Sequence, residues 1–387
     1  MTLLFIVPFA LGDSWWDARW KYRRSITIFE RSGKNLTDYP YLILVNYTPG
    51  MAEDFRDIRF VYYDKTGKMI QIPYWVEEYA NSSFAKVWIR IPQVPASKAA
   101  RVYMYFGNPG AASQSNGSAV FIHYSDWDDN TFQGWGINNP THKANAYVSN
   151  GYLVLASTGN RINVYYPVRI TNNMSIRMRA FKFPEYEGWV FGPGDGSIRT
   201  NPIMSNSDDF WKNGYIFGIA RALNTKMRIS EIKTTGVYDG VTEYRILAQV
   251  EFSVSSNELH TIEAYWYGSK LKVVDMETGT AASAASSTYA SLNYLQIGND
   301  WNYLCVDWIL VRPYTDPEPA YEMGPVEECK MPSLKGYLGP FAGIVIAILS
   351  LGAVVWSIRL LKMGLKPEIF IYIALILLAT LAILSTF

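Results

Sequence analysis

The chain has 387 residues, with 35 basic and 34 acidic side chains and a formal net charge of +1. This balance gives no electrostatic basis for binding nucleic acid, which needs a basic surface. The content of 13 Trp, 28 Tyr and 18 Phe is typical of β-sheet proteins, and aromatic side chains also stack on sugar rings. The stretch from about residue 14 to 330 is long enough for two ordinary domains.

The N-terminal run, MTLLFIVPFALG, is short and apolar. It ends in Ala10-Leu11-Gly12, which has the small-x-small form of a signal cleavage site. We therefore expect a signal peptide at residues 1–12. No basic residue precedes the run, so an uncleaved anchor or a buried first strand stays open as an alternative.

Residues 13–119 read as strands and turns. The segment RRSITIFE alternates polar and apolar residues, as a half-buried strand does. The segment DIRFVYYDKTGKMIQIPYWVE reads as strand, turn and strand, with the turn at Asp64–Gly67. Strands recur every 8–12 residues, which predicts a β-sandwich.

The segments WKYRRSITI, DIRFVYYDKTGKMIQIPYWVEEY, KVWIRIPQVPA and VYMYFGNPGA resemble, in this order, a domain of unknown function from archaeal and bacterial surface proteins. The resemblance covers roughly residues 15–125. Some family members sit beside biopolymer-transport proton-channel modules, which implies an alternative role as a sensory or coupling subunit of an envelope transport complex. The family has no established activity and transfers no catalytic residues.

Residues 120–314 have longer loops and many Gly and Asn, with strand-like segments between them and a hairpin at Tyr267–Lys270. Their order resembles a concanavalin-like jelly-roll, the fold of many lectin and laminin-G-type domains. In such domains an acidic start and a final "VDW" strand often lie side by side. The run SDWDDN at residues 125–130 is read first as an acidic solvated turn, with a Ca²⁺ site built from carboxylate oxygens as the alternative. The candidate ligands are Asp126, Asp128, Asp129 and Asp307.

Trp211 is the first candidate for stacking on a sugar, because polar loop residues surround it in SDDFWKNGY. Tyr215 follows it as the second candidate. The alternative is that Trp211 packs in the core. Glycan binding is implied by the resemblance to lectins and rests on fold analogy.

The histidines offer no catalytic motif. His123, His142 and His260 stand in no metal-ligand spacing, and no Gly-x-Ser-x-Gly elbow exists. The laminarinase-like Glu-x-Asp-x-x-Glu pattern is also missing. We expect no enzymatic activity, with a jelly-roll glycosidase, which needs two carboxylates, as the alternative.

The two cysteines form no CxxC pair, which argues against zinc or iron–sulfur sites. We predict a disulfide between Cys305 and Cys329, with alternation in CVDWILV placing Cys305 on the same face as Asp307. The alternative is a free thiol at Cys305, with Cys329 paired to another subunit or lipid-modified. Five Asn-x-Ser/Thr sequons permit N-glycosylation, at Asn35, Asn46, Asn81, Asn116 and Asn173.

The C-terminal part begins with a proline-rich, acidic segment at 315–336, which is expected to form a stiff stalk. Two uncharged runs follow, each about 19–22 residues long and so able to cross a bilayer. Together they predict a transmembrane hairpin at 337–387. The link between the runs is basic and should lie on the cytoplasmic side, through Arg359, Lys362 and Lys366.

The sequence thus predicts an all-β ectodomain of two sandwiches above a two-helix transmembrane hairpin. We expect a surface or envelope protein of a cell or virus that serves recognition, adhesion or structure. Its partners would be the lipid bilayer and glycans or other envelope proteins, and a homo-oligomer is compatible with the sequence. A coupling subunit should carry an ionisable residue in mid-span, and neither run has one.

Overall fold

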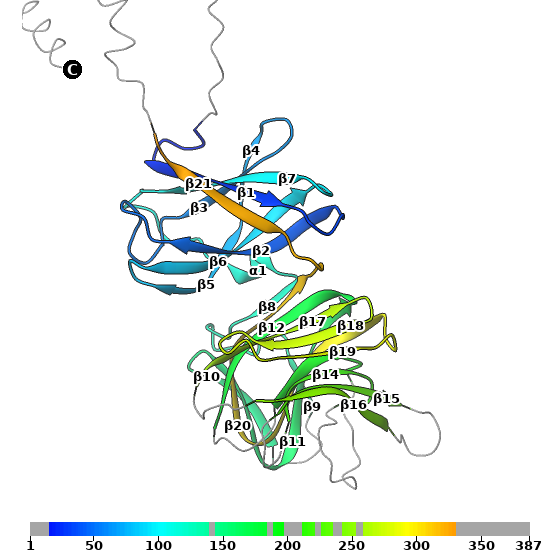
Figure 1. The fold of residues 1–387 in the computed structure, drawn as a ribbon. Helices are drawn as coiled ribbons and strands as arrows, with labels where there is room; N and C mark the ends of the chain where they lie inside the picture. The colour runs from blue at the N-terminus through cyan, green and yellow to red at the C-terminus, as the bar shows by residue number, and fades with distance from the viewer. Residues whose placement is uncertain are drawn as a thin grey trace, which may run out of the picture. The chain divides into compact units, whose positions relative to one another are not determined.

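The computed structural model describes residues 15–138, 144–183, 189–196, 211–220, 226–234, 242–252 and 258–329. The chain divides into two units, and the larger unit, Arg19–Glu327, contains two β-sandwiches. The described residues are strands and loops with a single helix of four residues, α1 (Gly117–Val120). The prediction of an all-β protein built from sandwiches is confirmed (Figure 1).

The first sandwich packs a five-stranded sheet, in the order β21-β1-β7-β3-β4, against a three-stranded sheet, in the order β2-β6-β5. The predicted turn at Asp64–Gly67 joins β3 to β4, because Gly67 N–H donates to the Asp64 carbonyl oxygen at 3.0 Å. The strands are β1 (Tyr22–Phe29), β2 (Leu36–Asn46), β3 (Arg59–Tyr63), β4 (Met69–Ile72), β5 (Tyr74–Ala80), β6 (Phe84–Val94), β7 (Ala99–Phe106) and β21 (Ala320–Glu328).

Strand β21 corrects the described part, up to residue 329, of the predicted stalk at 315–336, and it corrects the predicted domain boundaries. Figure 1 shows it beside β1, and Arg24 Nε donates to the Gly324 carbonyl oxygen at 3.0 Å although the two residues are 300 positions apart. Tyr321 packs against the core of the first sandwich. The first sandwich is therefore discontinuous in sequence, and the second is inserted between β7 and β21. Pro325 is tolerated because β21 is an edge strand.

The second sandwich is built mainly from antiparallel pairs, and two long strands pass through both of its layers. The predicted hairpin is present, because Tyr267 pairs with Lys270. The strands are β8 (His123–Ser125), β9 (Gly136–Asn138), β10 (Ala144–Ser149), β11 (Tyr152–Thr171), β12 (Asn173–Phe183), β13 (Trp189–Gly194), β14 (Gly214–Ala220), β15 (Lys226–Thr234), β16 (Thr242–Glu251), β17 (His260–Tyr267), β18 (Lys270–Asp275), β19 (Ala281–Ala285) and β20 (Ser291–Pro313).

Strand β20 organises the second sandwich. Its first half pairs with β13 and with the end of β11, and its second half pairs with β12, with β8 and with the start of β11. Leu304 and Val306 face inward, and beyond a register shift between Val306 and Trp308 the inward positions continue at Ile309; all three side chains are fully buried in one apolar core. The side chains between them face outward, and this outer face carries the site described below.

Several predictions fall on residues outside the described part. These are the signal peptide at 1–12, the hairpin at 337–387 and the basic link at Arg359, Lys362 and Lys366. Within the part of the chain that is described, no helix has the length and apolar character needed to cross a bilayer.

The predicted disulfide is wrong in this structure, because Cys305 and Cys329 are both free thiols. Cys305 lies within β20 of the second sandwich, whereas Cys329 follows β21 of the first.

Candidate functional site

The outer face of β10, β11, β20 and β12 carries a cluster of aromatic side chains, which we call the tyrosine face. In the strand register, Tyr147 is opposite Val154, and Val154 is opposite Cys305. Tyr303 lies two positions before Cys305 and on the same face of β20. Phe181, on the neighbouring strand β12, pairs with Cys305 and shares that face. The members of the tyrosine face are Tyr147, Tyr152, Phe181 and Tyr303.

These aromatic rings remain in contact with solvent. Tyr303 is 46% exposed and Tyr147 is 39% exposed. The rings of Tyr152 and Phe181 pack edge to face, with centroids 5.5 Å apart, and both side chains are half-buried. Exposed aromatic clusters with polar borders mark interaction sites on soluble domains more often than isolated apolar residues do.

An acidic border lies beside the tyrosine face, at the place where the sequence predicted a cation site. Ser125 of β8 pairs with Ile309 of β20, so the acidic loop and the "VDW" strand do lie side by side, as predicted. Trp127 is fully buried in the core and holds the loop in place. Tyr152 interacts electrostatically with Asp307, which places this carboxylate against the aromatic rings.

The carboxylates of this border repel one another. Burial raises the pKa of Asp307, with Asp128 and Asp126 adding to the rise and Arg179 opposing it. Burial likewise raises the pKa of Asp128, together with Asp126 and Asp129. Within the described part of the chain, the cation that opposes this rise is Arg179, whose Nε lies 3.7 Å from Asp307 Oδ2. The described side chains of the acidic border therefore carry a net negative charge.

The acidic border does not form a chelating group. Asp129 is occupied by its own loop, because its Oδ1 accepts hydrogen bonds from Thr131 N at 2.9 Å and Thr131 Oγ1 at 2.8 Å. Among the residues described, the carboxylates of Asp126, Asp128 and Asp307 are not close enough to hold one metal ion together. The structure thus makes three of the four predicted ligands electrostatic neighbours, and it does not gather their oxygen atoms around one point.

The prediction that Trp211 and Tyr215 stack on sugars is wrong, because both side chains are fully buried. Trp211 packs with Val190, Ile216 and Ile232 in a small apolar cluster. Tyr215 donates a hydrogen bond to Ser286 Oγ at 3.0 Å. Trp211 is buried although its neighbours in the sequence are polar, so their polarity did not predict its exposure.

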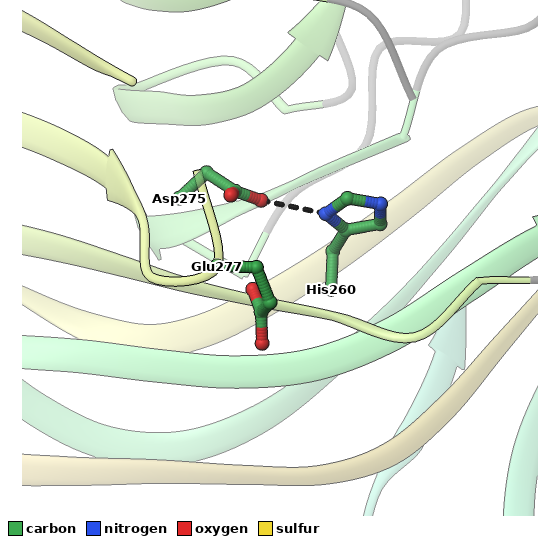
Figure 2. A group of neighbouring side chains, drawn as sticks. All are labelled: His260, Asp275 and Glu277. Carbon is green, nitrogen blue, oxygen red and sulfur yellow. Dashed lines mark hydrogen bonds and ion pairs between the residues drawn. The ribbon is translucent and has the colours of Figure 1, made fainter. Parts of the chain in front are cut away.

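Sequence reasoning also missed a group formed by His260, Asp275 and Glu277, in which the ligand atoms all lie within 4.8 Å of one another. Figure 2 shows the imidazole of His260 turned toward Asp275, with a hydrogen bond of 2.7 Å from Nδ1 to Oδ2. Asp275 Oδ1 accepts from Thr278 N at 2.7 Å, and Glu277 Oε2 accepts from Thr261 N at 2.8 Å.

These hydrogen bonds connect the loop after β18 to strand β17, so the group of His260, Asp275 and Glu277 has a structural role. The bond to Asp275 raises the pKa of His260, against the lowering effect of burial. Burial raises the pKa of Asp275, but its bonds from His260 and Thr278 outweigh burial and lower it. Both carboxylates are already satisfied by backbone donors, so this group fits a structural ion pair better than a metal centre.

The outer face of the same sheet also packs on the first sandwich through a buried ion network, which we call the seam network. Arg177 Nη2 donates to Glu77 Oε1 at 2.6 Å, and its Nη1 donates to Glu263 Oε2 at 2.8 Å. Arg312 Nη2 donates to Glu263 Oε1 at 2.8 Å, and its Nη1 donates to Glu318 Oε1 at 2.6 Å. The network links strands of both sandwiches.

The seam network is well satisfied. Burial alone would raise the pKa of Glu263, but Arg312 and Arg177 together lower it to about 2. Trp88 Nε1 donates to Glu77 Oε2 at 2.6 Å, and the Arg312 guanidinium lies 4.8 Å from the centre of the Trp88 ring. A pocket of about 250 Å³ adjoins the network. Its polar lining groups bind one another, which favours a structural role.

The five sequon asparagines are all exposed, as glycosylation requires.

The part of the tyrosine face that β20 contributes could have been found from the sequence of that strand. In NYLCVDW, strand alternation predicts Tyr303, Cys305 and Asp307 on one face, and both Cys305 and Asp307 interact electrostatically with Tyr152. The partners from β10 and β12 needed the register of the sheet.

Comparison with known proteins gives a family match of limited extent. A family model described as "Domain of unknown function (DUF2341)" matches residues 54–138, which agrees with the resemblance of the first sandwich. No curated protein matches the chain.

Solved structures resemble about half of the chain. A carbohydrate-binding module from Bacillus subtilis has 12% identity and a TM-score of 0.31, covering 49% of this chain and 95% of its own. A legume lectin-like domain from Entamoeba histolytica has 10% identity and a TM-score of 0.36, covering 47% and 91%. A β-1,3-glucanase from Mycobacterium marinum has 11% identity and a TM-score of 0.32, covering 49% and 98%. The likeness is limited to the coarse jelly-roll-like sandwich.

Proposed function

We propose that this protein recognises glycans at a cell surface or envelope, and that the tyrosine face of the second sandwich is the binding surface. The observation that carries the proposal is the exposure of Tyr303 and Tyr147 on one sheet face, beside half-buried carboxylates. Aromatic faces cover the apolar C–H side of a sugar ring, and neighbouring carboxylates accept hydrogen bonds from its hydroxyl groups.

The spacing of the aromatic residues suits an extended chain of sugars. Tyr147 and Tyr303 are two strands apart and offset by two residues along the strands. With strands about 4.8 Å apart and a rise of about 3.3 Å per residue, their Cα atoms lie about 12 Å apart. Small and apolar side chains, Val154 and Ala156, lie between them and leave a flat floor.

The proposed binding can be tested by screening the full-length chain, purified in detergent, on an array of immobilised glycans. The double variant Tyr147→Ala/Tyr303→Ala should lose binding while keeping its melting temperature. Tyr79→Ala is the matched control, because Tyr79 is 50% exposed but belongs to the first sandwich. An unchanged glycan profile for the double variant would refute the proposed surface.

Calcium at the acidic border stays a prediction. A bound ion would stabilise the folded state by mass action, so chelator should lower the melting temperature of the parent and Asp128→Asn should remove that effect. A melting temperature that does not respond to chelator would count against the ion.

The placement of these domains outside a membrane rests on the two apolar runs and their basic link. On intact cells, a cysteine at Lys362 should be shielded from an impermeant thiol reagent, and a cysteine at Ser333 should react. A Cys305→Ser/Cys329→Ser background removes the two native thiols. The opposite labelling pattern would refute an external ectodomain.

A further inference from the structure

The charges around the tyrosine face are unequal. Asp126, Asp128 and Asp307 interact with one another electrostatically, and the groups that face Asp307 from neighbouring elements are Arg179, Tyr152 and Tyr124. Arg179 and Asp307 are each more than a quarter exposed, with side-chain exposures of 28% and 29%. Among the described side chains, the guanidinium of Arg179 is paired with Asp307, and Asp126 and Asp128 add two further carboxylates at this surface.

The carboxylates sit along the border rather than around one point. Among the described residues, the ligand atoms of these three carboxylates do not all lie within 4.8 Å of one another. An extended arrangement of negative charge is instead matched by a ligand whose positive charges are themselves spread along a chain. A ligand with carboxylate or sulfate groups would add like charge to a partly desolvated border, where electrostatic repulsion is stronger than in bulk water.

We propose that the glycan bound by the tyrosine face carries free amino groups, so that its ammonium groups lie against Asp128 and Asp307 while its rings stack on Tyr147 and Tyr303. This inference rests on the proposed function and narrows it to one class of polysaccharide, the amino sugars. An ammonium group donates three hydrogen bonds and supplies the positive charge that the border lacks.

The test compares three hexasaccharides by titration against the full-length chain in detergent: hexaglucosamine, hexa-N-acetylglucosamine and hexagalacturonate. Hexaglucosamine should bind at least about tenfold more tightly than its N-acetylated counterpart, which corresponds to about 1.4 kcal/mol. Its advantage should shrink in 0.5 M salt, because salt screens exposed charges. Hexagalacturonate should not bind.

Charge-removing variants locate the effect. Asp128→Asn and Asp307→Asn should each lower the affinity for hexaglucosamine toward that for the N-acetylated form, without changing the latter. Asp54→Asn is the control, since it removes the same charge from an exposed residue of the first sandwich. The melting temperature of each variant confirms that it folds.

The outcomes separate the two proposals. Equal affinity for the amino and N-acetylated sugars, or preference for the galacturonate, would overturn the amino-sugar inference and leave glycan recognition intact. Binding that needs added calcium would overturn it in favour of a metal-bridged sugar. If the parent binds no glycan on the array, or if Tyr303→Ala binds the preferred glycan as the parent does, the proposed function itself fails.

Discussion

The seam network and the acidic border lie on the outer face of the same sheet, and β20 contributes Arg312 to one and Asp307 to the other. In the seam, two arginines enclose Glu263 and lower its pKa to about 2 despite complete burial. At the border, burial and neighbouring carboxylates outweigh one arginine, and the pKa of Asp307 is raised. The same strand thus contributes an arginine that satisfies the charge of Glu263 and a carboxylate, Asp307, whose own charge is not satisfied.

This difference distinguishes a carboxylate with a structural role from a carboxylate that is available to a ligand. A buried charge that has all its partners holds two domains in one arrangement, and a ligand would find no unpaired group there. A half-exposed carboxylate without enough partners costs stability, and a ligand can recover that cost. Perturbed pKa values of the second kind are the ones expected at binding sites.

Breaking the seam network should have the largest effect on stability. Arg177→Met leaves Glu77 and Glu263 buried without their shared cation, which should cost about 3–5 kcal/mol of unfolding free energy. Urea unfolding followed by tryptophan fluorescence measures this. Lys86→Met is the matched control, since Lys86 and Glu78 form an exposed pair at 2.8 Å worth no more than about 1 kcal/mol. Equal costs for the two variants would contradict the role of the seam.

Strand β21 provides the next largest effect. The ring of Tyr321 packs edge to face on Tyr41, with centroids 6.0 Å apart, and its hydroxyl accepts from Leu44 N at 3.1 Å. Tyr321→Ala should therefore cost about 2 kcal/mol, whereas Val326→Ala, at an exposed position of the same strand, should be nearly neutral. If residues 320–328 were a free stalk, both variants would be neutral.

The two described histidines should respond to pH in opposite directions. The pKa of His260 is raised by Asp275, so its contribution to stability is full below about pH 6.5 and declines as pH rises through its folded pKa. Burial lowers the pKa of His123 to about 4, so its contribution is full above about pH 6.5 and declines as pH falls toward 4.

His260→Gln should therefore cost more at pH 5.5 than at pH 8.5, by on the order of 1 kcal/mol. His123→Gln should show the reverse, with the larger cost at pH 8.5. Melting temperatures across this range give both profiles. Parallel profiles for the two variants would mean that the His260–Asp275 pair is not charged in the folded protein.

The smallest effect is a gain in stability. Because the folded protein raises the pKa of Asp307, the ionised carboxylate disfavours folding above its unfolded pKa, and this penalty disappears below it. Asp307→Asn should stabilise the protein at pH 7 by less than about 1 kcal/mol, and by nothing at pH 3. A loss of stability at pH 7 would place Asp307 with the satisfied carboxylates of the seam instead.

Local patterns in the sequence predicted strands and turns correctly where one hairpin or one alternation decided the outcome, as at Asp64–Gly67 and Tyr267–Lys270. The prediction for β21 was wrong because its Gly324 and Pro325 are typical of linkers, and its pairing with β1 spans most of the chain. Trp211 was misassigned because burial depends on tertiary neighbours such as Ile232. The resemblance predicted that the acidic loop lies beside the final strand. It did not predict how far apart the carboxylates of the acidic border lie.

The affinity of Tyr303→Ala for the glycan that the parent binds most tightly tests the central claim most directly. Calorimetric titration should show a loss of at least about tenfold, with a melting temperature within about 2 °C of the parent, because Tyr303 is 46% exposed and contributes little to the core. An affinity equal to that of the parent would contradict the assignment of the tyrosine face as the binding surface.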